Sequence, residues 1–148
     1  MALKDTIQAD MKAAMRAGDK QRLGTIRMLL AAIKQREVDE RTELDDSAVL
    51  QIVEKLIKQR REAAAQFAAA NRTDLQHKEE SEAEQLQAYL PEPLDEASLD
   101  ALIDTVIGET GASSIRDMGK VMNAIRAQAQ GRADMGLVSQ KVKARLGS

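Results

Sequence analysis

Basic side chains gather near the carboxyl end of the chain, and the chemistry open to them is the binding of an anionic partner. Between Ser113 and the end of the sequence, seven lysines and arginines stand against two acids, Asp117 and Asp134. The seven are Arg116, Lys120, Arg126, Arg132, Lys141, Lys143 and Arg145. This local excess of positive charge would attract phosphates or carboxylates. Alternatively, these side chains are solvated and only complement the dipoles of helix ends.

A second charged set stands where helical periodicity calls for apolar residues. Arg60 falls within the apolar stripe of one long helix, and Glu79 and Glu82 fall within that of the next. Arg27 lies at the edge of the stripe of an earlier helix. A charge that is desolvated without a partner is costly, so we expect these four residues to form a buried ion network. They would then fix the register of the helices, or they would line a polar groove as the site of a small enzyme.

Residue types that carry other chemistry are scarce. The chain has no cysteine, and His77 is its only histidine, which excludes thiol catalysis and the usual zinc spacings. The segment from Met118 to Lys120 lacks the second glycine and the Ser or Thr of a phosphate-binding loop. We therefore predict no catalytic residue, no metal site and no cofactor. The only aromatic residues are Phe67 and Tyr89, so RNA recognition would rest on phosphates and shape rather than on base stacking.

Composition points to an all-α protein. Of the 148 residues, 43% are hydrophobic, mostly Ala, Leu, Ile, Val and Met, and there are only two prolines. The net charge of −2 gives no overall field for nucleic acid, so any such binding must be local. The first ten residues carry charges where a signal peptide needs an apolar run, and no run approaches membrane-spanning length. These features predict a soluble, cytoplasmic protein with no membrane contact.

The first part of the chain predicts four helices. The first ends at Gly18, and Asp19 caps a second with the stripe Leu23, Ile26, Leu30 and Ile33. Residues 36–46 are polar and predict a loop, after which Asp45 caps a long third helix. Thr73 begins a capping-box pattern for a fourth helix that runs to about Tyr89. Both prolines follow in residues 91–93, which predicts a domain boundary and an N-terminal helical domain over residues 1–90.

The second part, residues 91–148, predicts a C-terminal domain of three helices. Asp95 caps the first of them, Ser114 the second and Asp134 the third. Residues 91–112 hold six acids and no base. This acidic helix could pack against the basic ones and neutralise them, which would weaken the case for an anionic partner.

Several segments together resemble the YqeY proteins. They are residues 23–34 (LGTIRMLLAAIK), 89–91 (YLP), 109–122 (ETGASSIRDMGKVM) and 131–134 (GRAD), in the order that the family has them. The match covers nearly the whole chain. These proteins are similar to the tail domain of the B subunit of the tRNA-dependent amidotransferase, a carbon-nitrogen ligase that uses glutamine as its amido donor.

The resemblance implies a four-helix domain followed by a three-helix domain that handles tRNA shape without doing chemistry. The family's tail motif, which would lie near RNA, is matched in this sequence at Gly119, Lys120, Gly131 and Arg132. Positions 128 and 130, often basic in the family, are Gln here, which thins the positive patch. We thus expect a tRNA-associated module that is not an enzyme on its own, with an aminoacyl-tRNA synthetase or amidotransferase subunits as further partners. The alternatives are a protein-interaction adaptor of the translation machinery and the small enzyme above. The oligomeric state is left open.

Overall fold

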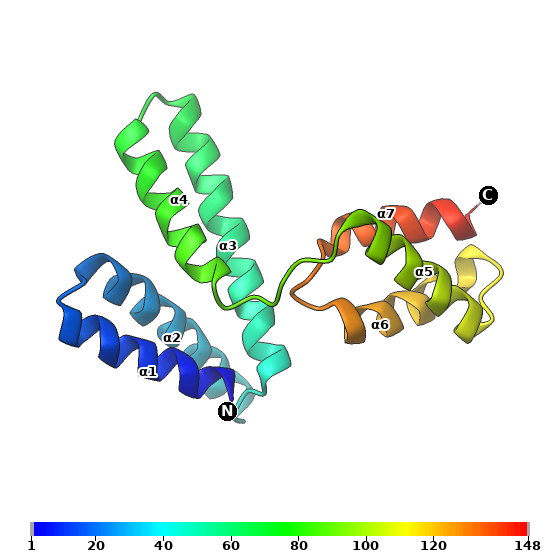
Figure 1. The fold of residues 1–148 in the computed structure, drawn as a ribbon, viewed down its shortest axis with the longest axis horizontal. Coiled ribbons are helices and arrows are strands. Elements are labelled where there is room, and N and C mark those ends of the chain that lie inside the picture. The colour runs from blue at the N-terminus through cyan, green and yellow to red at the C-terminus, as the bar shows by residue number, and fades with distance from the viewer. Residues whose placement is uncertain (1, 148) are drawn as a thin grey trace. The chain divides into compact units, whose positions relative to one another are not determined.

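The computed structural model describes residues 2–147, and over this range the protein is all-helical, which confirms the predicted class (Figure 1). The helices are α1 (Leu3–Ala17), α2 (Lys20–Glu40), α3 (Asp46–Ala69), α4 (Thr73–Gln87), α5 (Glu96–Thr110), α6 (Met118–Ala129) and α7 (Met135–Leu146). A short 3-10 helix, η1 (Ile115–Asp117), precedes α6. The chain divides into two compact units, unit 1 over residues 1–90 and unit 2 over residues 91–148.

Unit 1 is built from two helical hairpins, α1 with α2 and α3 with α4 (Figure 1). Asp19 accepts a hydrogen bond from the Arg22 N–H and starts α2, and Asp45 accepts one from the Ala48 N–H and starts α3. Gly18 takes the left-handed conformation, with φ of 67°, that ends α1. The three capping positions that the sequence indicated are therefore present.

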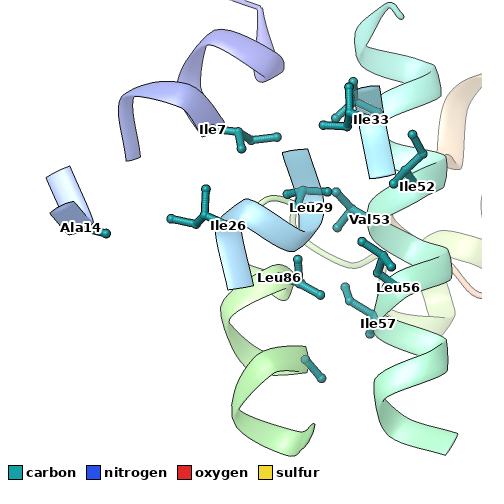
Figure 2. Close-up of a cluster of buried hydrophobic side chains, with 12 residues drawn as sticks. Ile7, Ala14, Ile26, Leu29, Ile33, Ile52, Val53, Leu56, Ile57 and Leu86 are labelled. Carbon is teal, nitrogen blue, oxygen red and sulfur yellow. The ribbon is translucent and has the colours of Figure 1, made fainter. Parts of the chain in front are cut away.

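The core of unit 1 lies where the two hairpins meet. Figure 2 shows Leu29 of α2 directed toward Val53 of α3, with Leu86 of α4 beside them, and all three side chains are fully buried. The buried residues of α2 are Thr25, Ile26, Leu29 and Ile33. The buried face of α2 is therefore centred on Leu29 and not on the Leu23 and Leu30 side of the predicted stripe.

Two boundaries in unit 1 differ from the sequence prediction. The loop expected over residues 36–46 is shorter, because α2 continues to Glu40 and Arg41 ends it in a left-handed conformation. An ion pair between Arg36 and Glu40, four residues apart on α2, supports this last turn. Thr73 is the first helical residue of α4 and not its cap; Arg72 holds the cap position without a side-chain hydrogen bond.

Unit 2 packs its three helices around a separate core. The fully buried side chains come from all three, with Ile103 on α5, Ile125 on α6 and Val142 on α7 among them. Asp95 caps α5 and Asp134 caps α7, both as the sequence indicated. Among residues 2–147, no helix is both long and apolar enough to cross a membrane.

Candidate nucleic-acid interface

The outer side of α6 is cationic. Val121, Ile125 and Ala129 recur every four residues and are buried in the core of unit 2. The opposite side of the helix is therefore exposed. Lys120 and Arg126 are exposed there, and Arg116 on η1 is exposed just before it. We call Arg116, Lys120 and Arg126 the α6 cations.

The one carboxylate between these cations is engaged with the backbone. Asp117 accepts hydrogen bonds from the N–H groups of Ser113, at 3.0 Å, and Ser114, at 3.4 Å. The Ser114 hydroxyl in turn accepts one from the Arg116 N–H, so the two side chains together cap η1. The bond from Ser113 is the main reason that the pKa of Asp117 is lowered. The carboxylate is hydrogen-bonded to the turn and not to the α6 cations, although the charge of Lys120 also contributes to its lowered pKa.

Among the described residues, the α6 cations have no carboxylate as a hydrogen-bond partner. Arg126 donates to the side-chain oxygen of Asn123, a neutral group, at 3.3 Å. None of the three forms an ion pair with any residue in the range 2–147. Gly119, which the family resemblance singled out, is exposed among them, and a Cβ built there meets nothing within 4 Å. Lys143 is a further exposed cation, on α7.

Other basic residues named from the sequence are bound within unit 2. The Lys141 ammonium lies 2.9 Å from Asp100 and 3.2 Å from Glu96, and the Asp100 hydrogen bond is the main cause of its raised pKa. Arg145 lies 3.4 Å from Asp100 and 3.0 Å from Asp104. The seven predicted cations therefore do not form one free surface, because the acids of α5 recur every four residues and make a row beside α7.

The remaining basic residue near the carboxyl end, Arg132, is held by backbone. Its Nε donates to the carbonyl of Glu92 at 2.9 Å, and its own carbonyl accepts from the Leu94 N–H at 2.8 Å. Gly131, next to it, is buried and has a positive φ of 77°. Arg132 therefore ties the segment before α5 to the turn between α6 and α7.

In unit 1, three of the four residues expected to form an ion network lie together. Arg60 of α3 is 3.4 Å from Glu79 and 3.6 Å from Glu82, both on α4. Only 26% of the Arg60 side chain and 14–16% of the two carboxylate side chains are exposed. The prediction is wrong for the fourth residue, Arg27. Arg27 is exposed and makes no ion pair within residues 2–147, because α2 is rotated toward Leu29 and carries Arg27 to its outer side.

The depression that the structure shows in unit 1 is separate from this network. This shallow depression of about 370 Å³ is lined by Arg61, Glu80, Ala83, Glu84, Gln87 and Ala88, and by none of the four network residues. His77 is exposed on α4. Within residues 2–147, no three His, Cys, Asp or Glu side chains are grouped closely enough to hold a metal ion.

The protein is thus a helical chain of two units, and its charged residues form ion pairs, bind the backbone or face solvent. Comparison with protein families is more specific: the family described as Yqey-like protein matches residues 4–146, and the chain belongs to this family.

Similar curated proteins come from fungi. One from Lachancea thermotolerans, named altered inheritance of mitochondria protein 41, mitochondrial, is 34% identical over 92% of this chain and 76% of its own length. A protein of the same name from Pyrenophora tritici-repentis is 32% identical over 96% of this chain and 80% of its own length. The predicted cytoplasmic location is contradicted by these relatives, because their names describe them as mitochondrial.

Proposed function

We propose that the chain is a non-catalytic module that binds tRNA through the α6 cations. The observation that carries this proposal is that three cations lie on the exposed side of α6 and form no ion pair within residues 2–147. Lys120 and Arg126 are roughly 9 Å apart along the axis of α6, at about 1.5 Å per residue, and Arg116 lies on η1, directly before α6. This axial spacing is comparable to the Debye length at physiological salt, about 8 Å, and the three cations would therefore act together on a nearby phosphate chain.

The kind of contact follows from the residue types. Unit 2 has no aromatic side chain, so bases have no platform on which to stack. Cations that reach phosphates recognise the shape of a folded RNA and not its sequence. In this proposal residues 91–148 form the docking domain and residues 1–90 a separate domain. The RNA would be presented to an aminoacyl-tRNA synthetase or an amidotransferase, as the family resemblance implies.

The test is tRNA binding by fluorescence anisotropy at 50 and 200 mM salt. Three phosphate contacts predict that the wild-type affinity falls roughly 20- to 40-fold between these conditions, from a slope of about −0.7 to −0.9 per contact. The variant Arg116→Ala, Lys120→Ala, Arg126→Ala should bind more weakly at 50 mM salt and lose most of this salt dependence.

The matched control changes Lys12, Lys55 and Lys58 to Ala, three lysines that are exposed on α1 and α3. The control variant should bind tRNA like the wild type. Circular dichroism checks that both variants remain helical. If the α6 variant binds with wild-type affinity and slope, the proposal is wrong.

A further inference from the structure

The outer side of α2 carries a row of cations that the core does not use. Lys20, Arg27 and Lys34 are all exposed and follow one another every seven residues. Seven residues are nearly two helical turns, so the three side chains project from one side of the helix, roughly 10 Å apart. The row lies opposite Leu29, the centre of the buried face.

Acids close to this row are already engaged. The pKa of Glu37 is lowered mainly by the hydrogen bond that it accepts from Lys4, and the nearby charge of Lys34 makes a smaller contribution. Its carboxylate also accepts the Leu44 N–H, at 3.0 Å. Asp39 accepts a hydrogen bond from Gln35. None of the three cations of the row forms an ion pair within residues 2–147.

A second row of small residues runs beside the cations. Gly24, Ala31 and Val38 also follow one another every seven residues and are exposed, Val38 to 59%. Together the six positions alternate in steps of four and three, which is the spacing of a helix–helix seam. We call Lys20, Gly24, Arg27, Ala31, Lys34 and Val38 the α2 seam. Gly24 is not at an end of α2 but within its length, where glycine is unfavourable for helix stability. A Cβ built at Gly24 meets nothing within 4 Å.

We propose that the α2 seam is a docking site for an acidic helix of a partner protein. A partner helix with an acid every seven residues has the same rise as α2, so each of its acids meets one cation. The small side chains between the cations leave room for the partner's own apolar side chains. Charge complementarity selects the partner, because the α2 seam has three cations and no acid. A phosphate chain as the occupant would neutralise the cations but would neither cover Val38 nor pack against the small residues.

The test uses a synthetic helical peptide as probe, with Glu every seven residues beside a row of Leu, and a scrambled peptide of the same composition. Both are measured against the full chain by fluorescence anisotropy at 50 mM salt. The heptad peptide should bind at least tenfold more tightly than the scrambled one. Charge reversal of the three cations (Lys20→Glu, Arg27→Glu, Lys34→Glu) should weaken binding at least tenfold. Charge reversal of three exposed lysines elsewhere in unit 1 (Lys12→Glu, Lys55→Glu, Lys58→Glu) changes the net charge equally and should leave it unchanged.

A second variant separates docking from folding. Gly24→Leu introduces a better helix former into open space, so the melting temperature should stay the same or rise. The bulky side chain should nevertheless block the seam and lower peptide affinity at least tenfold. The proposal would be overturned if the two peptides bound equally well. It would also be overturned if the control charge reversal weakened peptide binding as much as the seam charge reversal, or if Gly24→Leu bound the peptide like the wild type. Dimerisation of the wild type that the charge reversal of the seam abolishes would also overturn the proposal, because the occupant would then be a second copy of the chain. Displacement of the peptide by tRNA would overturn it as well.

Discussion

Removing Arg60 should destabilise unit 1, because it leaves Glu79 and Glu82 close together with no counter-charge. Breaking a fully buried ion pair from one side costs about 3–5 kcal/mol, and an exposed pair contributes about 0–1 kcal/mol. The three side chains are 14–26% exposed, between these limits. We therefore expect Arg60→Ala to lower the free energy of unfolding by about 2 kcal/mol. For a unit of this size that corresponds to a fall in melting temperature of roughly 8–16 °C.

Replacing the whole network should cost much less. The Arg60 Nε is buried and has no hydrogen-bond partner within residues 2–147, so part of its desolvation is not offset. Apolar side chains of similar length avoid that cost. The triple variant Arg60→Met, Glu79→Met, Glu82→Met should therefore lie within about 1 kcal/mol of the wild type. The exposed neighbour Arg61, changed to Ala, is the control and should change stability by less than about 0.5 kcal/mol.

The measurement is urea unfolding followed by tyrosine fluorescence. Tyr89 is the only tyrosine and the chain has no tryptophan, so this signal reports on unit 1 alone. A loss below about 0.5 kcal/mol in Arg60→Ala would refute the reasoning, because the pair would then behave as a surface pair. A triple variant that is as unstable as Arg60→Ala would refute it as well, since the instability could not come from unpaired carboxylates.

Two further predictions concern pH. The Tyr89 hydroxyl donates to Asp10 at 2.7 Å, and burial, more than this hydrogen bond, raises the pKa of Tyr89. The raised folded-state pKa means that the stabilisation is complete below the unfolded pKa of about 10 and is lost as pH rises beyond it. Tyr89→Phe should remove this alkaline loss in urea titrations followed by circular dichroism; an unchanged loss would contradict the assignment. In unit 2, backbone hydrogen bonds, chiefly from Ser98 to Asp95 and from Ser113 to Asp117, lower the pKa of both carboxyl groups. Their stabilisation is present above the unfolded pKa of about 3.9 and is lost as pH falls through the folded values. Asp95→Asn with Asp117→Asn keeps short polar side chains at the caps without the charge, so its stability should change less than that of the wild type below pH about 4. An acid loss equal to that of the wild type would exclude these caps as its source.

Local signals in the sequence were enough for several helix starts, and they were weaker for helix rotation. Asp19, Asp45 and Asp95 each cap the helix that they were expected to cap, because a short carboxylate bonds backbone N–H groups within three residues of itself. The rotation of α2 depends on contacts with α3 and α4, which are distant in sequence. An apolar stripe through Leu23 and Leu30 was as consistent with the residue pattern as one centred on Leu29. Arg27 was consequently assigned to the buried edge and not to the outer side of α2.

The cationic surfaces likewise depend on contacts between helices that are distant in sequence. Counting charges along residues 113–148 treats seven basic side chains as equivalent, although their availability depends on the helix beside them. Lys141 and Arg145 lie on α7 next to the acids of α5, and their charges are compensated within unit 2. Lys120 lies on the solvent side of α6 and forms no ion pair within residues 2–147. A binding surface in a helical protein of this kind is therefore defined by which cations remain without an ion pair after packing. On α6 and α2, those cations are the residues that the binding experiments change.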